Sequence, residues 1–141
     1  MILIDVNVLL YAHKEQAHEH SRYRAWLEGV MRGDEPYGVS ELVLSSFVQI
    51  ATHPKVFAPP SSLEQALEFV EVVRGQPNCV LLSPGERHWA LFGDLCRRAR
   101  AKGNLIPDAY LAALAIESGC EWVTTDRDFG RFPGLRWRAP F

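Results

Sequence analysis

The first thirteen residues, MILIDVNVLLYAH, place a carboxylate and an amide inside the most apolar stretch of the chain. Aliphatic residues run directly into Asp5 and resume at Val6, so this segment is expected to enter a hydrophobic core. Burying an unpaired charge is costly. Asp5 must therefore lie at the end of a buried strand, be paired with another group, or hold a cation.

The rest of the chain alternates between short apolar runs and segments with helical periodicity. Strands are expected at 1–4, 78–82, 121–125 and 135–138, and helices at 7–13, 22–32, 41–53, 62–74, 84–99 and 107–118. Several helices begin with a recognisable cap: Ser40, Ser61 in a capping box with Glu64, and Ser83 followed by Pro84. This alternation predicts an α/β sandwich around a mainly parallel sheet, with residues 1–141 forming a single domain.

Composition narrows the function classes. A hydrophobic fraction of 48% and a charged fraction of 23% are ordinary for a soluble globular protein. No apolar run is long enough for a membrane span, and the N-terminal residues lack signal-peptide features, so a cytosolic location is expected. The net charge of −2 argues against general polyanion binding. Nucleic-acid contacts would need local basic clusters, of which the densest is Arg97, Arg98, Arg100 and Lys102.

Four acids fall at equivalent places in this predicted fold. Asp5 and Asp126 end strands, whereas Glu41 and Asp108 lie in the first turns of helices. A single first-turn acid can simply serve the helix dipole. Helices that follow parallel strands, however, begin at the edge where the strands end, and ligand sites of such sheets lie there. All four carboxylates are therefore expected at one edge.

A cluster of carboxylates needs a cation to offset its repulsion; otherwise at least one should become protonated. An all-oxygen set with open positions suits Mg²⁺ or Mn²⁺, and zinc is disfavoured because no histidine or cysteine lies near these positions. Asn7 could bind a metal-bound water or orient a carboxylate, and Thr124 or Thr125 could do the same beside Asp126.

The motifs ILIDVNVLLYA, SEL from Ser40, PDAYLAALA from Pro107 and VTTDRDF from Val123 resemble those of PIN-domain ribonucleases, and most closely the VapC toxins of VapBC toxin–antitoxin modules. This resemblance implies a three-layer α/β/α sandwich with a parallel sheet. It also implies an acidic quartet with catalytic roles, made of Asp5, Glu41, Asp108 and Asp126. Asn7 and Thr124 match ancillary polar positions of the family. Asp128 is a second candidate for the fourth acid.

The resemblance further implies an endoribonuclease that depends on Mg²⁺, with Mn²⁺ as the alternative. Asp5, Asp108 and Asp126 would be the metal ligands, and a metal-activated water would attack the RNA phosphodiester. The expected partners are the RNA substrate, a cognate VapB antitoxin that covers the active-site groove, and a second copy of the chain in a homodimer. Promoter DNA would be bound only through the antitoxin.

Two other functions remain open at this point. A haloacid-dehalogenase-like phosphatase also has an aspartate after its first strand, but its DxDxT pattern is replaced here by DVNVL and no matching lysine is present. A receiver domain fails for the same lack of a lysine near the last strand. The non-enzymatic alternative is a catalytically inactive PIN fold that serves as a binding module.

Overall fold

The first strand of the chain occupies the centre of the sheet. The computed structural model describes residues 1–141 and contains one five-stranded sheet in the order β3-β2-β1-β4-β5. All four neighbouring pairs are parallel. The strands are β1 (Ile2–Ile4), β2 (Tyr37–Ser40), β3 (Cys79–Leu82), β4 (Glu121–Val123) and β5 (Trp137–Arg138). Their carboxyl ends therefore share one edge, as the sequence predicted.

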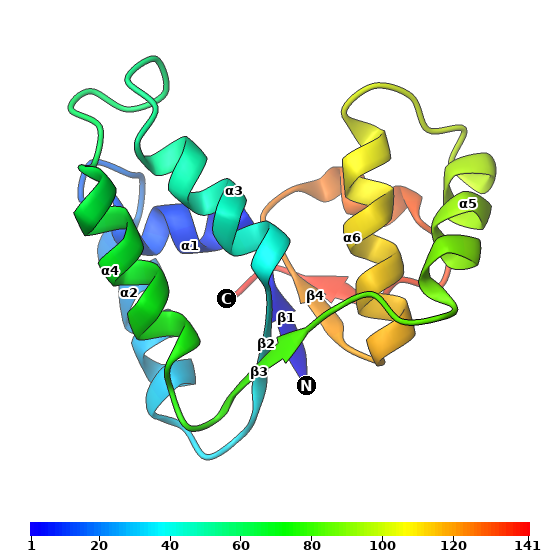
Figure 1. Ribbon diagram of the computed structural model, residues 1–141, viewed down its shortest axis with the longest axis horizontal. Coiled ribbons are helices and arrows are strands. Elements are labelled where there is room, and N and C mark those ends of the chain that lie inside the picture. The colour runs from blue at the N-terminus through cyan, green and yellow to red at the C-terminus, as the bar shows by residue number, and fades with distance from the viewer.

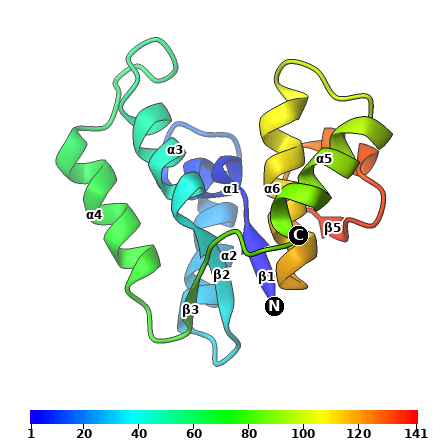
Figure 2. The same ribbon diagram turned by 45° about the vertical axis from the view of Figure 1, so that its right-hand side comes forward.

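Helices cover both faces of this sheet and complete a three-layer α/β/α sandwich. One layer contains α1 (Val6–His13), α2 (His20–Arg32), α3 (Glu41–Ala51) and α4 (Leu63–Arg74). The opposite layer contains α5 (His88–Arg98) and α6 (Leu105–Ser118), with the short 3-10 helix η1 (Arg127–Arg131) close by. Figures 1 and 2 show the sheet between these two groups of helices. None of the helices has the length and apolar character needed to cross a membrane.

The core lies along both faces of the central strands. Leu3, Ile4 and Trp122 are fully buried. On one side α6 presents a row of small residues that lets its backbone approach β4 closely; the buried members are Ala109, Ala112, Ala113 and Ala115. Because β1 is covered on both faces, its apolar run is continuous rather than alternating. This packing fixes the position of the residue that follows the strand, Asp5.

β2 is the element that the sequence did not predict. Its residues, YGVS, are all buried and pair with β1 on one side and β3 on the other. Pro36 and Gly38 weaken the strand signal in the sequence. The glycine has a packing reason, because a Cβ there would lie 2.6 Å from Leu82 Cδ1 and 3.2 Å from the Ile2 carbonyl oxygen.

Several predicted helix starts were wrong: α2 begins at His20 and not at Arg22, and α6 begins at Leu105 and not at Pro107. The capping box of α4 is formed by Ser62 and Gln65 instead of Ser61 and Glu64, and Ser61 bonds to His13. α5 begins at His88 and not at Pro84. The amides of Gly85 and Arg87 donate to the carboxylate of Glu117 on α6, and this competes with a helical turn over residues 83–87.

Asn78 ties the end of α2 to the start of β2 and β3, so its truncation tests how this side of the sheet is held. Its side-chain amide lies 3.1, 3.0 and 2.9 Å from the carbonyl oxygens of Val30, Gly33 and Glu35. We expect Asn78→Ala to lower the free energy of unfolding by about 1–3 kcal/mol, because these carbonyls lose their donor. Urea unfolding measures the change. The matched control is Gln76→Ala, whose exposed amide bonds only Val72; an equal loss there would contradict this assignment.

Candidate active site

Asp5 connects the central strand to the first helix. Its backbone N–H donates to the Val123 carbonyl on β4 at 3.0 Å, which extends the β1–β4 pairing by one residue. Its side chain then caps α1, because Oδ1 accepts the Val6 N–H at 2.7 Å. The residue is only 4% exposed. The apolar flanks of Asp5 in the sequence therefore bury the residue while its carboxylate stays at the strand end.

Thr124 orients this carboxylate from the neighbouring strand. Its hydroxyl donates to Asp5 Oδ2 at 2.6 Å and accepts the Asp126 N–H at 3.0 Å. Thr124 is fully buried, so the pair is shielded from solvent. Of the two neighbouring threonines that the sequence offered, the structure places Thr124 in this role. One hydroxyl thus links the acids that end β1 and follow β4.

Asp126 and Asp128 lie together at the start of η1. Asp126 caps this helix, because its Oδ1 accepts the Asp128 N–H at 2.9 Å. Asp126 is half-buried, whereas Asp128 is exposed. The structure therefore brings both candidates for the fourth acid to the same edge, with Asp126 nearer the core.

Asp108 joins this group from the opposite helical layer. It lies in the first turn of α6 and is partly buried. Burial raises its pKa to about 6, and the charges of Asp126, Asp5 and Asp128 add to the rise. The pKa of Asp5 is also raised to about 6, chiefly by burial, while its bonds to Thr124 and Val6 oppose the rise and Asp126 adds to it. The mutual repulsion that the sequence predicted for clustered carboxylates thus adds to the larger effect of burial.

Glu41 is held apart from these acids. Its side chain is 65% exposed and lies 3.3 Å from Nη2 of Arg74 at the end of α4. Its charge contributes to neither of the raised pKa values. Sequence reasoning missed Arg74, because no local pattern links a residue in the last turn of one helix to an acid 33 positions earlier.

Asn7 supplies the one orphaned side-chain acceptor near the acids. Its Oδ1 is buried and has no hydrogen-bond partner. It lies in the first turn of α1, two residues after Asp5. A buried amide oxygen without a donor costs free energy unless a ligand or water satisfies it.

The donor set fits a hard divalent cation in its chemistry. Every candidate ligand is an oxygen, two carboxyls have raised pKa values that a cation would lower, and Asn7 Oδ1 is free to accept a bond. In the present side-chain positions no three of these groups converge on one metal position. Asp5, Asp108 and Asp126 are the carboxylates that could hold such an ion if their side chains adjust.

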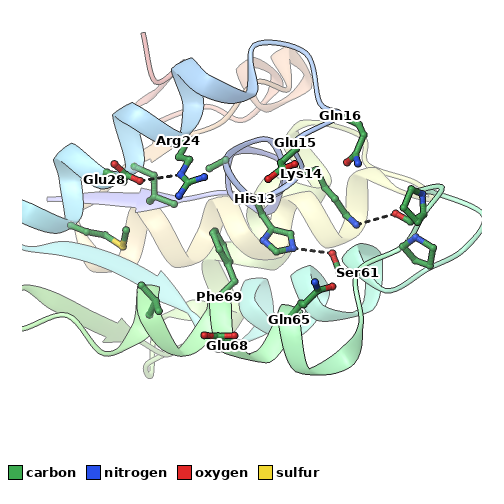
Figure 3. Close-up of a pocket in the computed structure, with 16 residues that line it drawn as sticks. His13, Lys14, Glu15, Gln16, Arg24, Glu28, Ser61, Gln65, Glu68 and Phe69 are labelled. Atoms are coloured by element: carbon green, nitrogen blue, oxygen red, sulfur yellow. Dashed lines mark hydrogen bonds and ion pairs between the residues drawn. The ribbon is translucent and has the colours of Figure 1, made fainter.

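A separate open cleft of ≈ 580 Å³ lies beyond the other end of α1. Figure 3 shows that His13 faces Ser61 across it, with Phe69 alongside. His13 Nε2 is 2.9 Å from Ser61 Oγ, and its ring packs against Phe47 and Phe69. None of the predicted site acids lines this cleft.

The raised pKa of Asp5 predicts a pH-dependent stability. Because the folded pKa of about 6 exceeds the ordinary value of 3.8, ionisation of Asp5 favours unfolding. The stability that protonated Asp5 contributes to the folded state is fully present below pH 3.8 and is lost as the pH rises through 6. In EDTA we expect Asp5→Asn to gain about 2 kcal/mol over the wild type between pH 4 and pH 8. Thermal unfolding measures this, with Glu64→Gln as the control; a constant difference between Asp5→Asn and the wild type would contradict it.

Comparison with known proteins agrees with this architecture. The PIN domain family model matches residues 2–135. "Ribonuclease VapC25" of Mycobacterium tuberculosis is 44% identical over 140 residues, covering 99% of this chain and 99% of that protein. "Ribonuclease VapC43" of the same species is also 44% identical, covering 99% of this chain and 95% of its own length.

Solved structures show the same fold at low identity. The "VapBC2 from Rickettsia felis bound to a DNA fragment from their promoter" matches with a TM-score of 0.73 at 19% identity, covering 99% of this chain and 98% of that one. The "DNA bound VapBC from Salmonella typhimurium" matches with a TM-score of 0.66 at 22% identity over the full length of both chains. The resemblance inferred from the four sequence motifs is confirmed. The chain belongs to the PIN domain family and, within it, to the VapC ribonucleases.

Proposed function

We propose that this chain is the toxin of a VapBC-type module and acts as a Mg²⁺-dependent endoribonuclease, with Mn²⁺ as an alternative ion. One observation carries the proposal: Thr124 bonds both Asp5 Oδ2 and the Asp126 N–H at the carboxyl edge of the sheet, and the charges of these two acids contribute to the raised pKa of Asp108. The proposal treats residues 1–141 as one PIN domain and places it in the cytoplasm, where RNA is available.

The residues of the site have distinct tasks in this proposal. A divalent cation, when bound, would activate a water and stabilise charge on the RNA phosphate. Thr124 keeps the Asp5 carboxylate oriented and favours its ionised form, because its hydroxyl donates to Oδ2. Asp108 and Asp126 supply the other carboxylates. Asp126 is preferred to Asp128 because its backbone is fixed by Thr124.

Glu41 and Asn7 complete the proposed machinery in supporting roles. Glu41 would act from the rim of the site, and it must first leave Arg74 or share that guanidinium with an RNA phosphate. Asn7 Oδ1 would accept a bond from a water in the site, which would satisfy its buried oxygen. These roles explain why both residues lie at the catalytic edge without touching Asp5.

The cleft beside α4 is the surface that we assign to the antitoxin. Apolar side chains of Leu27, Met31, Phe69 and Val72 line it among polar residues. Val72 is 49% exposed and lies beside these apolar side chains in the cleft. An amphipathic segment of a VapB-type partner would bury these groups and extend along α1 toward the acids. Promoter DNA would then be bound through that partner.

A homodimer is the second assembly that we propose. β3 lies at the edge of the sheet, and its Val80 and Leu81 are 36% and 42% exposed. Leu42, at the start of α3, is 50% exposed. A second copy would cover these apolar groups and protect the unpaired strand edge.

Loss of RNA cleavage on removal of a single carboxylate tests the nuclease assignment. We expect Asp5→Asn and Asp108→Asn each to reduce cleavage of single-stranded RNA at least 100-fold in Mg²⁺, and EDTA to abolish wild-type activity. Glu64→Gln is the matched control, because Glu64 is also a first-turn acid but lies outside the site. Unchanged cleavage by Asp5→Asn would refute the mechanism. RNA binding without any cleavage by the wild type would favour the inactive module, and phosphate-monoester turnover the phosphatase.

The antitoxin surface is tested by co-purification. We expect a small protein encoded beside this gene to purify with the chain and to suppress its nuclease activity. Val72→Glu should weaken that complex at least tenfold, because a charge would be buried against the apolar side chains of the cleft. Val56→Glu is the control, since Val56 is 55% exposed outside the cleft. Equal affinity of both variants for the partner would place the antitoxin elsewhere.

A further inference from the structure

The end of α5 and the turn that follows it carry a concentrated positive charge that no role described above uses. Within six residues it has four exposed cations, which we call the basic turn: Arg97, Arg98, Arg100 and Lys102. The chain as a whole has a net charge of −2, so this patch differs in sign from its surroundings. Only Arg98 has an ion-pair partner, the exposed Asp94 at 3.6 Å. The other three cations have no acidic partner.

Backbone hydrogen bonds hold the basic turn in one conformation, so the Cα atoms of these cations have defined positions. Ala99 N–H donates to Leu95 O at 2.9 Å, and Ala101 N–H donates to Cys96 O at 2.8 Å. Arg100 and Gly103 adopt left-handed conformations with φ of 51° and 58°. A left-handed arginine is unusual and reverses the chain tightly after α5. The charged side chains therefore project into solvent from a short, hydrogen-bonded turn.

The basic turn lies at the same edge of the molecule as the acids. It runs directly into α6, since Leu105 N–H donates to the Lys102 carbonyl at 3.3 Å, and α6 carries Asp108 in its first turn. Both ribbon views show this turn at the upper end of the α5–α6 pair, the end toward which the strands run (Figures 1 and 2). None of its cations is ion-paired with Asp5, Asp108 or Asp126. They are free to bind an anion that also reaches the acids.

We propose that the basic turn binds the sugar–phosphate backbone of the RNA strand beside the phosphate that is cleaved. Guanidinium and ammonium groups bind phosphate oxygens, which are the contacts that position a nucleic-acid strand, and no aromatic residue lies between Arg97 and Lys102 to stack on a base. The turn therefore positions RNA without reading its sequence. This inference rests on the proposed nuclease function and adds a substrate-positioning surface to it.

An RNA strand fits this surface better than the antitoxin does. The basic turn belongs to the α5–α6 layer, whereas the cleft assigned to the antitoxin is lined by α1, α2 and α4 in the other layer. A strand that contacts the turn can continue over the start of α6 to the acids. Binding of the antitoxin to the basic turn is the alternative that the variants below distinguish.

The test removes three charges at once: Arg97→Gln/Arg100→Gln/Lys102→Gln. Binding of a fluorescent, unstructured single-stranded RNA is measured by anisotropy in EDTA, where no cleavage is expected, over a range of salt concentrations. We expect affinity at 50 mM salt to fall at least tenfold. The slope of log affinity against log salt should decrease in magnitude by about 2, since each phosphate contact contributes about 0.7 for single strands. In Mg²⁺, KM should rise more than kcat changes.

Two further variants separate charge from fold and from position. Arg97→Lys/Arg100→Lys/Lys102→Arg keeps the charges and should retain affinity within about threefold. Arg22→Gln/Arg32→Gln/Lys55→Gln removes the same number of exposed charges from the other layer and should leave RNA affinity unchanged. If the neutral triple variant does not fold, Lys102→Gln alone should still lower the salt slope by about 0.7.

The outcomes distinguish this inference from the nuclease proposal. If the neutral variant binds RNA like the wild type, or if the control variant loses as much affinity, the basic turn is not the RNA surface. If the neutral variant keeps RNA affinity but loses the antitoxin, the turn belongs to the protein partner and this inference is wrong. If wild-type protein binds RNA through the turn but never cleaves it, the nuclease proposal fails and the binding surface stands.

Discussion

The buried carboxylate of Asp5 is the constraint on which the arrangement of this protein depends. It lies at the end of the central strand, whose two faces are covered by apolar packing. Its only hydrogen-bond donors are the Val6 N–H at the start of α1 and the Thr124 hydroxyl. Those two bonds join β1, α1 and β4 at one point. The raised pKa shows that they do not fully compensate burial. The fold therefore holds an acid in a place where its charge is unfavourable, which is typical of a functional site.

The parts of this structure that follow from local pattern could be predicted from the sequence. β1, α3, α6 and the edge position of Asp5, Asp108 and Asp126 rest on apolar runs, caps and the geometry of parallel sheets. β2 could not be predicted, because YGVS becomes a strand only through pairing on both sides. Long-range bonds decided the other differences. The Glu117 carboxylate accepts bonds from amides that an earlier start of α5 would have used. Arg74 pairs with Glu41, which lies apart from the other acids.

The two helical layers have different tasks in the proposed scheme. The α1–α4 layer contains the cleft assigned to the antitoxin, and β3 is the exposed edge of the sheet that we assign to the dimer. The α5–α6 layer carries the basic turn, suited to RNA. Asp5 lies between the layers. Thr124 links it to Asp126, and Asp108 lies in the first turn of α6. Binding of protein and binding of RNA are thus built on opposite sides of one acidic edge.

The raised pKa values of Asp5 and Asp108 also set protons and divalent cations in direct competition. Each carboxyl holds its proton up to about pH 6, so a cation that binds both must displace them below that pH. With two coupled protons, the apparent affinity for the ion can fall by up to about 100-fold for each unit of acidification. In the proposed metal-dependent nuclease, burial of Asp5 would therefore make metal occupancy, and not only carboxylate charge, a steep function of pH.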